Sequence, residues 1–144
     1  MSYLDGISKR LEGFVIAVDF DGTCVEHRYP EIGRSIGAEP VLAALSESGA
    51  KLILWTMRSG DKLHAAVQWF SDRNIPLWGV NSNPEQKDWT GSPKAYAHLY
   101  IDDGALGVPL VRGEGARPYV DWIRVREVIE DMAKNVFIEP IIKS

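Results

Sequence analysis

The sequence has a single cysteine, no apolar run long enough to span a membrane and no excess of basic residues. One thiol, Cys24, cannot form an internal disulfide. Because a spanning run and a signal peptide are both missing, we expect a cytoplasmic protein that does not associate with membranes. With 16 Lys and Arg against 20 Asp and Glu, the formal net charge is −4. This balance makes nucleic acid an unfavourable partner.

The composition is that of one globular domain. The 144 residues are 45% hydrophobic and 25% charged, and contain neither a repeat nor a low-complexity tract. This length can bury one substantial core but not two. We therefore expect one domain over residues 1–144.

Apolar runs alternate with helical patterns along the chain. Buried strands are predicted at residues 14–18, 51–55, 76–80 and 98–101, with a further short strand near 108–111. Helices are predicted from Glu39 to Gly49, from Asp61 onward and over residues 119–134, with a brief one at Ser92-Pro93. This alternation predicts an α/β fold, a three-layer sandwich around a central parallel sheet with right-handed crossovers.

The first predicted strand ends in Asp19-Phe20-Asp21-Gly22-Thr23. In an extended chain the two carboxylates point the same way, Gly22 allows a sharp turn and Thr23 adds a hydroxyl. An Asp-Gly turn that merely ends a strand is the ordinary alternative.

Other polar residues follow or precede the later strands. Thr56 and Arg58 come after the second strand, Asp102 and Asp103 after the fourth, and Lys94 shortly before the fourth. Ligands of such sheets bind at the carboxyl ends of the strands, so these groups are expected to meet at one edge.

A group of acids at one edge requires a cation, and Mg²⁺ suits oxygen ligands and phosphate. Asp19 can attack phosphorus and form an aspartyl-phosphate, while Asp21 can exchange a proton with the leaving oxygen and with water. The metal ligands would be Asp19, Asp102 and the backbone carbonyl of Asp21.

The remaining predicted site residues would contact phosphate. Thr56 can donate to a phosphate oxygen, and Lys94 can neutralise charge. The backbone N–H groups after Asp19, freed by the turn at Gly22 and Thr23, can complete an oxygen cradle. Arg58, His27 and Arg28 are candidates for substrate contact, with a solvated surface role as the equal alternative.

These residues resemble the four signature motifs of the haloacid dehalogenase (HAD) superfamily phosphatases. Asp19-Phe20-Asp21-Gly22-Thr23 matches the first, Thr56 the second, Lys94 the third and Asp102-Asp103 the fourth. The resemblance covers about residues 14–103 and implies a Rossmann-like HAD core. It also implies that Asp19 is the nucleophile, Asp21 the general acid/base and Asp102 a direct metal ligand. Asp103 would bind the metal through water or orient Lys94.

The order of these residues argues against a response-regulator receiver, in which the acid pair precedes a lone phospho-acceptor Asp.

The two places where relatives insert a cap domain hold only a loop over residues 25–37 with one helix, and residues 81–93. The chain therefore resembles the capless (C0-type) subgroup.

Without a cap, the site is open unless the loop over residues 26–36 or a second subunit covers it. The phosphorylated substrate is then either large (a phosphoprotein or a nucleic-acid end) or small and held partly by a homo-oligomer that supplies the missing walls. We favour a small metabolite. The apolar residues Phe137, Ile138, Ile141 and Ile142 would either form such an interface or pack on the core.

The predicted function is that of a Mg²⁺-dependent phosphatase acting on a phosphate monoester. The alternative is a non-catalytic phosphate-binding or regulatory module that retains the HAD pocket. Cys24 is expected to be a small, half-buried hydrophobic residue and not a nucleophile, because no His-plus-Asn partnership is evident.

Overall fold

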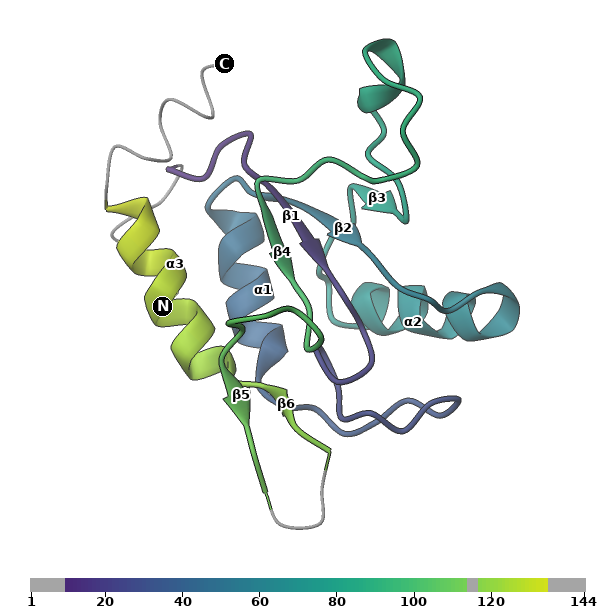
Figure 1. Cartoon of the computed structure of the whole chain (residues 1–144), viewed down its shortest axis with the longest axis vertical. Helices are drawn as coiled ribbons and strands as arrows, with labels where there is room; N and C mark the ends of the chain where they lie inside the picture. Colours follow the sequence, from purple (N-terminus) through teal and green to yellow (C-terminus); the bar gives the residue numbers. More distant parts are fainter. Residues whose placement is uncertain (1–9, 114–116, 135–144) are drawn as a thin grey trace.

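The computed structural model describes residues 10–113 and 117–134 (Figure 1). The strands are β1 (Val15–Val18), β2 (Lys51–Leu54), β3 (Gly79–Val80), β4 (Leu99–Ile101), β5 (Leu110–Val111) and β6 (Tyr119–Val120). The helices are α1 (Ala38–Glu47), α2 (Gly60–Asp72) and α3 (Trp122–Ala133), together with the short 3-10 helix η2 (Gln86–Asp88). No helix in these described ranges has the length and apolar character needed to cross a membrane.

The central sheet has four parallel strands in the order β3-β2-β1-β4. The α/β class and the parallel sheet predicted from the sequence are thus confirmed. All four residues of β1 are buried, because this strand lies inside the sheet and both of its faces are covered.

The helices pack on one face of the sheet. Ile16 and Val18 of β1 and Leu52 and Leu54 of β2 share one hydrophobic cluster with residues of α1, α2 and α3. Figure 1 shows α1 behind the sheet and α3 beside α1. Successive crossovers from β1 to β2 and from β2 to β3 run in the same direction across the sheet, so the right-handed rule places α1 and α2 on the same face.

The opposite face is covered by extended chain. Val15, Ala17 and Ile53 pack there against Ala95 and Ala97. The connection from β3 to β4 runs back past β1, so a right-handed path takes it over this second face. Within the described residues, this connection contains η2 and no α-helix, so the predicted three-layer sandwich is not confirmed.

Three predicted elements differ in the structure. The brief helix predicted at Ser92-Pro93 is wrong: neither residue is helical, and Pro93 lies in a bend. The strand near residues 108–111 does form, but β5 pairs antiparallel with β6 in a separate two-stranded sheet. The last helix begins at Trp122 instead of Tyr119, because Asp121 caps it by accepting a hydrogen bond from the N–H of Arg124 at 3.2 Å.

The third predicted strand is also shorter than expected, since only Gly79 and Val80 of residues 76–80 pair with β2. The apolar tail residues Phe137, Ile138, Ile141 and Ile142 lie outside the described residues.

Candidate active site

Three carboxylates meet at the carboxyl edge of the central sheet. Asp19 follows β1, and Asp102 and Asp103 follow the neighbouring strand β4. The N–H of Asp19 donates to the carbonyl of Ile101 at 2.9 Å, which holds the two strand ends together. One oxygen from each carboxylate lies within 4.8 Å of the others, so this acid triad can hold a metal ion. The predicted convergence of these acids is confirmed to that extent.

The environment of Asp19 disfavours its negative charge. Burial, more than any other influence, raises the pKa of Asp19 from 3.8 to about 8. The charge of Asp102 contributes to this rise in pKa, whereas hydrogen bonds from the Thr23 hydroxyl, at 2.8 Å, and from the backbone of Phe20 oppose it. A cation beside the triad would offset both burial and repulsion, which is the electrostatic requirement of a metal site.

The Gly22–Thr23 turn holds the acids in place. Gly22 has a φ of +80°, and a Cβ at this position would clash with Oδ2 of Asp103. The fully buried Thr23 donates its hydroxyl proton to Asp19 and accepts a hydrogen bond from the N–H of Asp103 at 3.0 Å. The N–H groups of Gly22 and Thr23 donate to the carbonyls of Val25 and Phe20. These two N–H groups are therefore used within the turn, which orients the carboxylates, while the predicted cradle of N–H groups after Asp19 stays a prediction.

Trp122 supports this turn from the start of α3. Its indole N–H donates to the carbonyl of Thr23 at 2.6 Å, and only 2% of the residue is exposed. The sequence offered no sign of this contact, because the two residues are 99 positions apart.

Replacing Trp122 by phenylalanine is expected to lower the free energy of unfolding by about 1–3 kcal/mol, because the buried carbonyl of Thr23 loses its donor. Denaturant titration measures this loss. The matched control is Trp89→Phe: Trp89 is 64% exposed, and its replacement should change stability by no more than about 0.5 kcal/mol. Equal effects of the two substitutions would contradict the assigned role of the indole N–H.

A cavity of about 300 Å³ opens beside the triad. It is lined by Asp19, Trp55, Thr56, Met57, Asn81 and Asp102. Sequence reasoning named Thr56 but missed Trp55, Met57 and Asn81, although all of them follow β2 or β3 within three residues.

Asn81 and Thr56 form the polar wall of this cavity. Asn81 has a left-handed φ of 53°, donates its N–H to the carbonyl of Leu54 and accepts the N–H of Thr56 on its side-chain oxygen at 2.8 Å. The Thr56 hydroxyl accepts the N–H of Arg58 at 3.1 Å, which leaves its own proton for a ligand.

Lys94 is not joined to the acid triad by an ion pair or hydrogen bond in the described part of the chain. Its exposed ammonium group lies 5.3 Å from the ring centre of Tyr100. Buried Gln86 fixes the surrounding backbone by donating to the carbonyls of Ser92 and Lys94 at 3.1 and 2.9 Å and accepting from Tyr96 at 2.7 Å. The catalytic role of Lys94 stays a prediction.

Arg58 contacts Asp21 and not the cavity. Its guanidinium donates to both carboxylate oxygens of Asp21, at 2.8 and 2.7 Å. Its other N–H groups donate to the carbonyls of Pro30, Glu31 and Lys62. All five donors thus have protein acceptors, which leaves none for the substrate contact predicted from the sequence.

The buried thiol of Cys24 does not act as a nucleophile. Cys24 is fully buried, beyond the half-burial expected, and its thiol donates to the carbonyl of Asp19 at 3.3 Å. Burial raises the pKa of this thiol, so it stays protonated. Arg28 lies 3.7 Å from Glu26 in an exposed ion pair.

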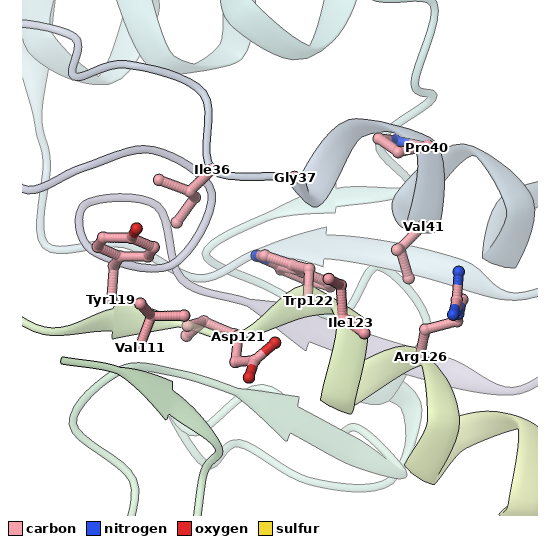
Figure 2. A pocket seen from close by; sticks show the side chains of 11 residues that line it. Ile36, Gly37, Pro40, Val41, Val111, Tyr119, Asp121, Trp122, Ile123 and Arg126 are labelled. Carbon is pink, nitrogen blue, oxygen red and sulfur yellow. The ribbon is translucent and has the colours of Figure 1, made fainter. Parts of the chain in front are cut away.

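A second cavity of about 280 Å³ lies between the start of α1, the β5–β6 sheet and the start of α3 (Figure 2). Its lining is mainly apolar, with Tyr119, Asp121 and Arg126 as its polar members. Asp121 already caps α3, and the triad is not part of this lining. The chemistry of the acids therefore belongs to the first cavity.

Comparison with known proteins found one informative relative. No family model matches the chain, and no curated protein matches it. A solved structure, described as that of a conserved protein coded by a locus from Bacteroides thetaiotaomicron, is 38% identical. The match covers 84% of this chain and 93% of that chain, with a TM-score of 0.66. At this identity and coverage, the chain belongs to the same family as the conserved Bacteroides protein.

Proposed function

We propose that the protein is a Mg²⁺-dependent phosphatase with a capless HAD-like core, which hydrolyses a phosphate monoester through an aspartyl-phosphate on Asp19. The observation that carries this proposal is the acid triad, whose oxygens lie within 4.8 Å of one another beside an open cavity. Three hard oxygen donors with one or more open positions fit Mg²⁺, which usually keeps substrate phosphate and water among its ligands.

Asp19 would perform the first chemical step. One of its carboxylate oxygens attacks phosphorus, the bond to the leaving oxygen breaks, and Asp21 supplies the proton for the departing alcohol. In the second step water attacks the aspartyl-phosphate, Asp21 takes the proton from water, and inorganic phosphate leaves with Asp19 regenerated. Mg²⁺, when bound by Asp19, Asp102, the Asp21 carbonyl and Asp103 directly or through water, would supply the positive charge that lets a carboxylate approach a phosphate dianion.

Other residues of the chain would orient the phosphoryl group. The Thr56 hydroxyl has its proton available beside Asp19 and would donate it to a phosphate oxygen. Lys94 would leave the Tyr100 ring and extend its flexible four-carbon stem toward the added phosphate charge. Arg58 uses only part of the acceptor capacity of Asp21, because each carboxylate oxygen has further lone pairs for substrate or water.

The open cavity suits a small phosphorylated metabolite. Met57, one of the wall residues, is 99% exposed, so a substrate can enter from this side. A second subunit of a homo-oligomer could cover this entrance. We propose neither a membrane nor a nucleic acid as partner, in line with the net charge of −4.

The alternative, a non-catalytic phosphate-binding module, is favoured by two observations. Lys94 lies at Tyr100, and both oxygens of Asp21 accept hydrogen bonds from Arg58. A module of this kind would bind phosphate and Mg²⁺ without turnover.

Hydrolysis of an aryl phosphate, followed by release of the coloured phenol, separates the two functions. We expect turnover that requires Mg²⁺, stops when the metal is chelated and returns when Mg²⁺ is restored. Asp102→Asn should lose this response, whereas Asp61→Asn, at an exposed position in the first turn of α2, should keep it. Calorimetric binding of Mg²⁺ and phosphate without any turnover would favour the non-catalytic module.

A further inference from the structure

The loop over residues 25–35 is held by contacts within its base and by contacts of its tip with Arg58. At its base, Val25 forms a β-bridge with Ser35, and the N–H of Glu26 donates to the carbonyl of Arg34 at 2.9 Å. Arg34 and Glu26 also form a bidentate ion pair, with N–O distances of 2.8 and 3.0 Å. At its tip, the carbonyls of Pro30 and Glu31 accept hydrogen bonds from Arg58.

Arg58 joins this tip to Asp21 through one rigid group. The guanidinium is planar, so the N–H groups that bind Asp21 and those that bind the loop carbonyls move together. The side chain of Arg58 is 1% exposed and that of Asp21 is 13% exposed, which keeps water from replacing either partner. The rings of Phe20 and Tyr29 each lie 5.1 Å from the guanidinium carbon and restrict its position further.

We propose that Arg58 is a positioning residue that couples the 25–35 loop to the carboxylate of Asp21. A displacement of the loop tip shifts the guanidinium plane, and the shift of this plane rotates the carboxylate that it holds. The position of the loop tip therefore sets the orientation of the proposed general acid/base through Arg58. The kinetic part of this proposal rests on the proposed phosphatase function, whereas the coupling itself does not.

Hydrogen exchange tests the coupling without any turnover. The N–H of Glu31 donates to the carbonyl of Arg28 at 2.9 Å, so its exchange rate reports on the order of the loop tip. Asp21→Asn removes the charged acceptor while keeping its shape. Arg58→Lys keeps the positive charge but loses the bidentate hydrogen bonding of the planar guanidinium. Each is expected to speed exchange at the tip by about tenfold or more, with amides of α3 unchanged. Unchanged exchange at the tip in both variants would overturn the coupling.

Glu26→Gln is the matched control on the same loop. It weakens the ion pair with Arg34 at the base but leaves every contact of Arg58 intact. We expect this substitution to leave turnover of the aryl phosphate unchanged. A loss of turnover equal to that in Arg58→Lys would mean that general loop order matters and not the guanidinium, which would overturn the proposal.

Steady-state kinetics then distinguish positioning from simple structural support. Arg58→Lys is expected to lower kcat by about 100-fold with little change in KM, since misplacement of a reacting group by about 1 Å has costs of this size. Added guanidinium ion should restore part of kcat in Arg58→Ala, because it can donate to the same acceptors, the Asp21 carboxylate and the carbonyls of the loop tip. If Arg58→Lys does not fold, Tyr29→Ala tests the same positioning role. This substitution removes a half-exposed ring beside the guanidinium and leaves the buried ion pair in place, and it should lower kcat by about tenfold.

These experiments distinguish a failure of the phosphatase proposal from a failure of the proposed coupling. A wild-type protein without turnover would contradict the phosphatase proposal, yet the exchange measurement would still decide the coupling. Faster exchange at the tip with an unchanged kcat in Arg58→Lys would overturn the positioning role while leaving the phosphatase proposal intact.

Discussion

Replacing Asp19 by asparagine is expected to lower kcat for aryl phosphate hydrolysis by about 10⁴-fold or more while the protein stays folded. The amide keeps the shape of the side chain and can still accept the hydrogen bond from Thr23, but it lacks the charge needed to attack phosphorus. Because the pKa of Asp19 is raised to about 8 mainly by burial, removal of this charge should not destabilise the metal-free protein. Single-turnover kinetics with thermal unfolding of the same samples measure both effects.

Asp61→Asn is again the control for this substitution, because it removes one exposed carboxylate on α2 outside the cavity. A second check uses the intermediate: acid-quenched wild-type protein should retain phosphate on a peptide containing Asp19. A folded Asp19→Asn variant with near-normal turnover would show that another group attacks phosphorus.

The second large effect is a dependence of stability on both pH and Mg²⁺. In the folded, metal-free protein the raised pKa lets Asp19 keep its proton up to about pH 8, whereas in the unfolded chain Asp19 releases it near its ordinary pKa of 3.8. The folded state therefore binds more protons in this window, and the stability that Asp19 contributes is fully present below pH 3.8 and lost as pH rises to about 8. The expected slope is at most about 1.4 kcal/mol per pH unit.

Mg²⁺ should reverse this trend, because it binds the ionised form of Asp19. The increase in melting temperature on adding Mg²⁺ is expected to be larger at about pH 8.5 than at about pH 6, where protons compete for the same carboxylate. At 100 times its dissociation constant the metal would stabilise the folded state by about 2.7 kcal/mol. Scanning calorimetry at several pH values measures the effect, with Asp19→Asn as the variant that should lose the pH dependence. A Mg²⁺ response that is independent of pH would contradict the placement of the metal at Asp19.

The parts of this protein that could be predicted from the sequence depend on local pattern. Five apolar residues before Asp19 are typical of a buried strand, and β1 forms where this pattern lies. The convergence of Asp19 with Asp102 and Asp103 also follows from pattern, because parallel strands end at a common edge. These two inferences needed no knowledge of individual side-chain contacts.

The parts that could not be predicted depend on contacts between distant residues. Arg58 was expected either to contact a substrate or to lie solvated at the surface, but it is buried and its acceptor is Asp21, 37 positions earlier in the chain. The support of Thr23 by Trp122 is more distant still. The missing helix at Ser92-Pro93 has a different cause: buried Gln86 satisfies the backbone carbonyls of Ser92 and Lys94, so helical hydrogen bonds are not needed there.

The connection between β3 and β4 limits how this protein can acquire new specificity. The segment that carries Lys94 also shields Val15, Ala17 and Ile53, through Ala95 and Ala97. An insertion that enlarged substrate recognition at this place would expose apolar sheet residues to water, so gains in selectivity would act against folding. The tip of the 25–35 loop covers none of these residues, and its side chains Arg28, Pro30 and Ile32 are exposed. Under the proposed phosphatase function, sequence variation that adapts the protein to different phosphate esters should therefore accumulate at this tip, while the β3–β4 connection keeps its length.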